Sequence, residues 1–176
     1  MLDKLASRLP EGARVLDAGC GAGVPVAQQL SRRFEVVGVD FAETQIQLAR
    51  KLVPKAHFDC QDILQLSYPD STFDAICSYY AIIHIPRQEH EGLFRRFFRL
   101  LKPSGLALLC LGADDLEDDI VEDYLGARMY WSHFDQATNL ELLARSGFDL
   151  IWSRILPDAT SPGPGHLFVL VQKSPT

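Results

Sequence analysis

Short apolar runs alternate with segments of helical periodicity from about residue 14 to residue 111, and this alternation limits the fold more than any other feature. It is the pattern of β-α-β units, in which a helix carries the chain from one strand to a parallel neighbour. The predicted class is α/β. The predicted strands are 14–18, 35–39, 56–60, 73–78 and 106–111, with helices at 24–33, 43–53 and 87–101.

Two further strands are predicted near the end of the chain, at 148–156 and 166–173. The connector between them is rich in proline and glycine and is too short for a crossover helix. We therefore expect these two strands to form an antiparallel hairpin at the edge of the sheet. A helix capped by Asp135 or Thr138 is expected to precede them and to end at Gly147.

Charge and cysteine content narrow the class of protein. The net charge of −6 argues against a nucleic-acid backbone as the main partner, because such affinity depends largely on Lys and Arg. No apolar run is long enough to span a membrane, and the first ten residues lack the apolar core of a signal sequence. The four cysteines are widely spaced and show no metal-binding pattern, so we expect reduced thiols and a cytoplasmic protein.

A glycine-rich turn, Val15-Leu-Asp-Ala-Gly-Cys-Gly-Ala-Gly23, leads directly from the first strand toward a helix. Such turns let the backbone approach a nucleotide, in nicotinamide and flavin enzymes as in others. Asp40 ends the next strand, 21 positions after Gly19, where a carboxylate meets ribose hydroxyls. Asp17 argues against a nicotinamide cofactor, since nicotinamide-binding turns usually have an apolar residue there. A P-loop is excluded because no Gly-Lys-Ser/Thr follows.

Several motifs in register, including Val36-Val-Gly-Val-Asp40, Gln61-Asp62 and Leu100-Leu-Lys-Pro-Ser-Gly-Leu106, resemble those of class I S-adenosylmethionine-dependent methyltransferases. The resemblance implies a Rossmann-like, doubly wound sheet of seven strands. That sheet is mostly parallel, has the strand order 3-2-1-4-5-7-6 and ends in an antiparallel hairpin. It also implies a single domain over residues 1–176 that binds S-adenosylmethionine and releases S-adenosylhomocysteine.

Carried over to this chain, the resemblance assigns cofactor-binding residues one by one. The methionine part would contact the glycine loop, which Asp17 organises, and carbonyls near Ser78 and Tyr79 would receive its ammonium group. Asp40 would bind the ribose, and the adenine would lie among residues of the second and third crossovers. The full set is Asp17, Gly19, Cys20, Gly21, Gly23, Asp40, Phe41, Gln45, Asp62, Ile63, Ser78 and Tyr79.

The acceptor is expected to be a small organic molecule, as in methyltransferases of the quinone-biosynthesis type. Ser78-Tyr-Tyr-Ala81 replaces the Asp/Asn-Pro-Pro-aromatic motif typical of enzymes that methylate nucleic-acid bases. Because the methyl group of this cofactor is already activated, its transfer to an acceptor held close to it requires no metal. His84 and His133 are the candidate bases, each with a structural role as the alternative, whereas His57, His90 and His166 are interpreted as surface or strand residues. Tyr80, Met129, Tyr130 and Trp131 are candidates for the acceptor pocket or for the core.

Few residues precede the first strand, where related enzymes usually carry helices that roof the active site. Residues 112–135, which begin acidic and end aromatic, are therefore expected to cover the substrate side. A second subunit is an alternative cover and would make the protein a homodimer; otherwise the acceptor site is incomplete. Two rival functions stay open: a catalytically silent cofactor-binding or partner protein, and an NAD(P)-dependent oxidoreductase.

Overall fold

The computed structural model describes residues 1–124, 126–157 and 163–174. Within these residues a seven-stranded sheet has the order β3-β2-β1-β4-β5-β9-β8. The first five of its strands are parallel, and β9 pairs antiparallel with both β5 and β8. This confirms the predicted topology. The strands are β1 (Arg14–Ala18), β2 (Glu35–Asp40), β3 (His57–Cys60), β4 (Phe73–Ser78), β5 (Leu101–Gly112), β8 (Phe148–Leu156) and β9 (His166–Lys173).

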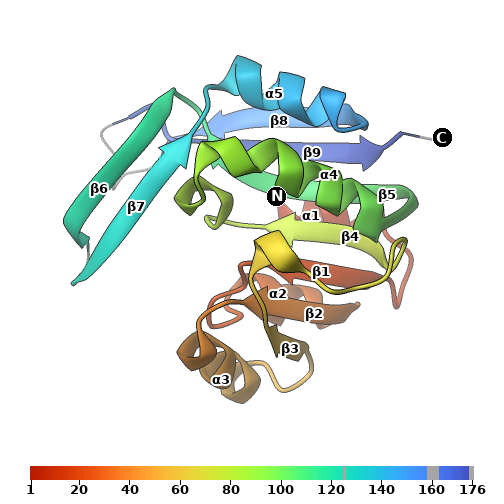
Figure 1. Ribbon diagram of the computed structural model, residues 1–176. Helices are drawn as coiled ribbons and strands as arrows, with labels where there is room; N and C mark the ends of the chain where they lie inside the picture. Colours follow the sequence, from red (N-terminus) through yellow and green to blue (C-terminus); the bar gives the residue numbers. More distant parts are fainter. Residues whose placement is uncertain (125, 158–162, 175–176) are drawn as a thin grey trace.

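Helices cover both faces of the sheet (Figure 1). The helices α1 (Leu2–Ala6), α2 (Val26–Leu30) and α3 (Glu43–Leu52) lie on one face, and α4 (His90–Leu100) and α5 (Gln136–Arg145) lie on the other. Three short 3₁₀ turns complete the helical structure: η1 (Ile63–Gln65), η2 (Ile82–His84) and η3 (Arg87–Glu89). Among the described residues, no helix has the length and apolar character needed to cross a membrane.

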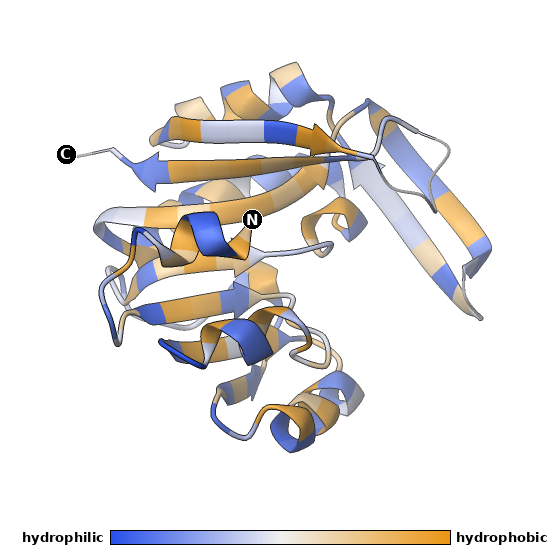
Figure 2. Cartoon of the chain, turned by 180° about the vertical axis from the view of Figure 1, so that it is seen from behind, coloured by the Kyte–Doolittle hydropathy of each residue, from blue (hydrophilic) through white to orange (hydrophobic). Residues whose placement is uncertain are grey.

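The core consists of two apolar layers, one on each side of the sheet. Alternate residues of the central strands enter opposite layers: Leu16 belongs to the layer under α4 and α5, and Val15 to the layer under α1 to α3. Strands buried on both faces are continuously apolar, which explains why the sequence predicted them well. Figure 2 shows this character along β5 and β9.

Three element boundaries differ from the prediction by three or more residues: the end of α2 and the starts of α4 and β5. Helix α2 is shorter than predicted at both ends, because residues 24–25 continue the turn after the glycine loop and residues 31–33 form a separate turn. Helix α4 begins at His90, after the separate turn η3. His90 is buried at the start of this helix, so its interpretation as a surface or strand residue was wrong. Strand β5 begins earlier than predicted because Leu101 already pairs with Phe73 of β4.

A second sheet, not predicted, is formed by β6 (Leu116–Tyr124) and β7 (Ala127–His133). The two strands are antiparallel and are irregular in register at two places. Acidic residues dominate β6, and the sequence lacks the regular alternation of a half-buried strand. The sequence pattern therefore did not predict these two strands. This β6–β7 hairpin projects from the side of the main sheet at which the parallel strands end (Figure 1).

Candidate cofactor and acceptor site

The glycine loop is held against the end of β2 by its own backbone. The N–H groups of Gly19 and Cys20 both donate to the carbonyl of Val39, at 2.8 and 2.9 Å. Gly19 has a φ of +76°, and a Cβ at this position would overlap the Cβ of Ala81. Only glycine satisfies both conditions, because an L side chain disfavours this φ and would also meet the segment after β4.

Asp40 ties the glycine loop to the start of α3. Its Oδ2 accepts the N–H of Gly21 at 3.0 Å and its Oδ1 accepts the N–H of Ala42 at 2.9 Å. The carboxylate is therefore fixed at the carboxyl end of the sheet, beside the loop and half-buried. Its two oxygens have further lone pairs, so the same group can still accept hydroxyl donors from a ligand.

Asp17 is the most unusual residue of the site. It is 1% exposed, and its Oδ2 has no hydrogen-bond partner among the described residues. Burial raises the pKa of Asp17 to about 7, and the nearby charge of Asp40 adds to the increase. A backbone hydrogen bond from Ala27 acts in the opposite direction, but a buried carboxylate with one oxygen unpaired is costly, so a cationic or donor ligand at this end of the sheet would satisfy it.

Replacing Asp17 with Asn is expected to stabilise the ligand-free protein at pH 8. The unfolded carboxyl has a pKa near 3.8, whereas the folded one keeps its proton up to about pH 7. Stability therefore falls as pH rises from about 4 to 7, and the change should remove a cost on the order of a few kcal/mol above that range. Thermal unfolding of both proteins from pH 4 to pH 8 measures this; equal curves at pH 8 would contradict it.

Asp74→Asn is the matched control, and its effect on stability is expected to have the opposite sign. Burial alone would raise the pKa of Asp74, but bonds from Lys102 and from the backbone of Arg14 lower it overall. This carboxylate therefore contributes stability that is present at neutral pH and lost as pH falls. The control variant should be less stable than the parent at pH 8.

The residues predicted to surround an adenine ring lie around the ends of β2 and β3. Phe41 is 80% exposed, so its ring is an open apolar surface. The exposed Gln45 on α3 faces the loop, with its Oε1 3.9 Å from where a Cβ of Gly21 would lie. Asp62 is exposed and caps η1 by accepting the N–H of Leu64 at 2.9 Å, whereas the side chain of Ile63 is buried in the core. Their roles toward a cofactor stay predictions.

The segment predicted to meet the methionine part begins at the end of β4. The buried Ser78 hydroxyl donates to the carbonyl of Ala18 at 2.9 Å and so joins the ends of β1 and β4. The ring of Tyr79 packs edge-on against Phe168, and burial raises its pKa. Tyr80 has a φ of +54° and is 50% exposed. Backbone strain of this kind in a non-glycine residue is common at ligand sites.

The two predicted bases differ in their surroundings. His84 ends η2 and is half-buried; its Nδ1 lies 2.8 Å from the carbonyl of Tyr130 on β7. His133 is buried at the base of the β6–β7 hairpin, where its Nδ1 lies 2.8 Å from the carbonyl of Asp114. His133 also fills the space beside Gly112, where a Cβ would overlap its ring. The structure thus gives His133 an evident packing role.

Strand alternation separates the predicted pocket residues of β7. Met129 and Trp131 point to one face, where the Trp131 ring contacts the rings of His84 and Tyr124. Tyr130 points to the other face, and its hydroxyl donates to Asp118. Met129 and Trp131 can therefore line one pocket together, whereas the Tyr130 side chain lies on the opposite face and reaches η2 through its carbonyl.

Two residues that matter for this geometry were not predicted. Ala81 approaches Gly19 closely, and its small size is the only local sign of that contact. Arg87 joins the body to the hairpin through ion pairs with Asp115 at 2.8 Å and Glu117 at 3.4 Å, and its guanidinium lies over Phe134. No local pattern marks Arg87, because its partners come from about 30 residues further along the chain.

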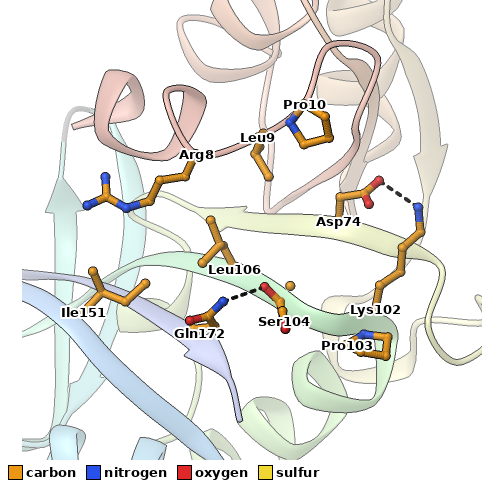
Figure 3. Close-up of a pocket in the computed structure, with 11 residues that line it drawn as sticks. Arg8, Leu9, Pro10, Asp74, Lys102, Pro103, Ser104, Leu106, Ile151 and Gln172 are labelled. Atoms are coloured by element: carbon orange, nitrogen blue, oxygen red, sulfur yellow. Dashed lines mark hydrogen bonds and ion pairs between the residues drawn. The ribbon is translucent and has the colours of Figure 1, made fainter. Parts of the chain in front are cut away.

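A cavity of about 380 Å³ lies at the opposite end of the sheet (Figure 3). It is formed where β4 and β5 begin and includes the Asp74–Lys102 ion pair at 2.8 Å. In doubly wound sheets ligands bind outside the carboxyl ends of the strands. This cavity is therefore separate from the glycine loop.

Comparison with known proteins agrees with this geometry. Residues 15–105, which include the glycine loop and the first five strands up to the start of β5, match the family described as "Methyltransferase domain". The chain belongs to this methyltransferase family.

Relatives of this methyltransferase domain extend the comparison beyond the matched residues. The Streptomyces halstedii methyltransferase GfsG is 31% identical over 95% of the chain and 65% of its own length. Phosphoethanolamine N-methyltransferase 3 of Arabidopsis thaliana is 34% identical over 80% of the chain, but the match covers 30% of its own length. The chain thus spans less than two thirds of these relatives.

A crystal structure of a methyltransferase from Methanosarcina mazei shares the fold of this domain. The two superpose with a TM-score of 0.86 over 98% of each chain, at 22% sequence identity. This likeness covers the whole described fold, including the antiparallel strands at the edge of the sheet.

Proposed function

We propose that this methyltransferase domain transfers a methyl group from S-adenosylmethionine to a small organic acceptor. The buried, unpartnered carboxyl oxygen of Asp17 carries this proposal. Asp17 and Asp40 lie close enough to influence each other's charge, so two carboxyl groups border the glycine loop. The Asp40 carboxylate would repel a pyrophosphate, and Asp17, which ionises more readily beside a cation, favours a ligand with a sulfonium and an ammonium group.

The residues present suit this cofactor. Asp40 would accept the ribose hydroxyls, Phe41 would lie along the adenine, and Asp62 would accept the adenine amino group. Asp17 and carbonyls near Ser78 would serve the methionine part. When bound, the cofactor supplies an activated methyl group. The chain then has to hold an acceptor in line with it and exclude water, and orientation of this kind is worth about 10⁵ to 10⁸ M in effective concentration.

The β6–β7 hairpin is the proposed cover of the acceptor side, within a single domain over residues 1–176. The position of the hairpin supports this proposal. Strand β7 packs against η2, and η2 follows β4 and contacts the glycine loop through Ala81. One of the relatives is a phosphoethanolamine N-methyltransferase, which supports a small-molecule acceptor here.

A cytoplasmic location and a homodimer are further proposals. Among the described residues no disulfide joins Cys20, Cys60, Cys77 or Cys110, which is typical of proteins from a reducing compartment. The exposed apolar side chains of Leu150 and Ile151 on the edge strand β8 support a homodimer. Sedimentation of the purified protein would test the second proposal.

Calorimetry with three ligands tests the proposed function. S-adenosylmethionine and S-adenosylhomocysteine are expected to bind, and NAD is not. Binding of NAD in preference to both would overturn the proposal in favour of an oxidoreductase. Methyl transfer is then measured as a mass increase across a panel of phenols, amines and carboxylic acids; binding without turnover on the whole panel would favour the silent cofactor-binding protein.

A further inference from the structure

The turn η2 connects the glycine loop with the β6–β7 hairpin. Ala81, just before η2, touches Gly19, and His84 at its end touches β7. The His84 ring lies 4.3 Å from that of Trp131, tilted by 58°. A histidine is thus placed between the predicted cofactor site and the proposed cover, on a turn held from both sides.

The hairpin determines which nitrogen of His84 carries the proton. A carbonyl oxygen can only accept a hydrogen bond, so Nδ1, 2.8 Å from the carbonyl of Tyr130, must be the protonated nitrogen. Nε2 then has a lone pair and makes no hydrogen bond to any residue in the described part of the chain. This is the arrangement of a general base that is oriented through its other nitrogen.

The groups around His84 keep its ring neutral. Burial lowers the pKa of His84, and the neighbouring His133 of β7 and His166 of β9 lower it further, although the Tyr130 carbonyl acts in the opposite direction. No set of three or more His, Cys, Asp or Glu side chains in the described residues is arranged to bind a metal.

Two groups of aromatic rings lie near His84. On the hairpin, Trp131 contacts the His84 ring and lies edge-on to Tyr124, and on the main sheet Tyr80 lies edge-on to His166 at 5.1 Å. Tyr80 is half exposed and held in a strained conformation, so its side chain is accessible to a ligand. Aromatic surfaces of this kind suit a flat, apolar ring.

We propose that His84 Nε2 is the general base for a hydroxyl on an aromatic or enolic ring, so that the reaction is O-methylation. This inference rests on the proposed function. The acceptor O–H bond breaks and its proton moves to Nε2, while the oxygen forms a bond to the methyl carbon. The bond from that carbon to sulfur breaks, and its electron pair stays on the sulfur, which becomes neutral.

Charge favours a phenolic acceptor over a carboxylate or an ammonium acceptor. Residues 114–133 contain seven acidic residues and one Arg, a net charge of −6 that equals that of the whole chain. A carboxylate acceptor would be repelled by this hairpin and has no proton for His84 to take. An ammonium would bring a second positive charge beside the sulfonium, whereas a phenol that loses its proton neutralises that charge.

The test compares His84→Asn with the parent protein. The asparagine amide nitrogen takes about the place of Nδ1 and can still donate to Tyr130, but nothing replaces Nε2. We expect cofactor affinity to change by less than about twofold and kcat with phenols to fall by about 10² to 10⁴, the usual contribution of a general base. The acid limb of the kcat/KM profile, which the lowered pKa of His84 shifts below the ordinary histidine range, should also disappear.

The acceptor panel contains phenols of graded acidity, with anilines and benzoates of matching ring shape. Methyl ethers are the expected products, and His57→Asn, at an exposed site on β3, is the control with parental rates. Preference for anilines or benzoates, a fully active His84→Asn, or loss of its cofactor affinity would each overturn the inference. Failure of the proposed function itself is distinct, because the parent protein would then not bind S-adenosylmethionine.

Discussion

Gly19→Ala is expected to lose cofactor binding by at least a factor of about 100 and to unfold at a lower temperature than the parent. The new Cβ would overlap that of Ala81, and the backbone there has a φ of +76°. The left-handed conformation costs an L residue about 1 to 2 kcal/mol, and overpacking typically adds about 1 to 3 kcal/mol. The loop and η2 must move apart, which displaces both halves of the site.

Gly21→Ala in the same loop is the matched control. Its φ of +50° is also positive, but the nearest atom to a new Cβ, Oε1 of Gln45, lies at an ordinary 3.9 Å. This variant should therefore show only the backbone cost, about 1 to 2 kcal/mol. Adding Ala81→Gly to Gly19→Ala should restore part of the stability. Thermal unfolding and calorimetry measure these differences; if the two single variants behave alike, contact with η2 is not what requires glycine at position 19.

Asp40→Ala is expected to weaken S-adenosylmethionine binding by a factor of 100 or more. Each hydrogen bond from a ribose hydroxyl to the carboxylate is worth roughly 1.5 to 3 kcal/mol. The change also removes the acceptor of the Gly21 and Ala42 N–H groups, so the loop loses its tie to α3. Stability without ligand should fall by about 1 kcal/mol.

Two further variants make the Asp40 result specific. Asp40→Asn keeps one acceptor oxygen and should bind with intermediate affinity. Asp70→Ala, an exposed residue paired with Arg99 on the other side of the molecule from the loop, should bind as the parent does. Affinities are measured by calorimetry at one ionic strength, and parental affinity in Asp40→Ala would remove this residue from the site.

Local signals predicted the parallel half of the fold correctly. The central strands are buried on both faces, so each stands out as an apolar run, and Lys102-Pro103-Ser104-Gly105 marks the end of the preceding helix even though β5 begins earlier. The glycine loop could also be predicted, because positive φ at Gly19, Gly21 and Gly23 favours glycine, and these glycines are present in the sequence.

Features that depend on distant partners were missed. The β6–β7 hairpin was predicted only as a cover, because its strands are acidic and are stabilised by contacts with Arg87 and η2. His90 was misplaced for the same reason: its burial comes from packing near Phe94 and Phe134, and the second of these lies far along the chain. The opposed directions of Tyr130 and Trp131 followed only once β7 was known to be a strand.

The sequence by itself determined which segments form the strands of the main sheet, the turning glycine loop and the carboxylates beside it, because each depends on residue types and short spacings; the strand order was implied by the family resemblance. Tertiary structure alone decided that Ala81 closes on Gly19 and that Tyr130 orients His84. Those contacts join residues 62 and 46 positions apart, and they form only when the end of β4 is packed between the loop and the hairpin.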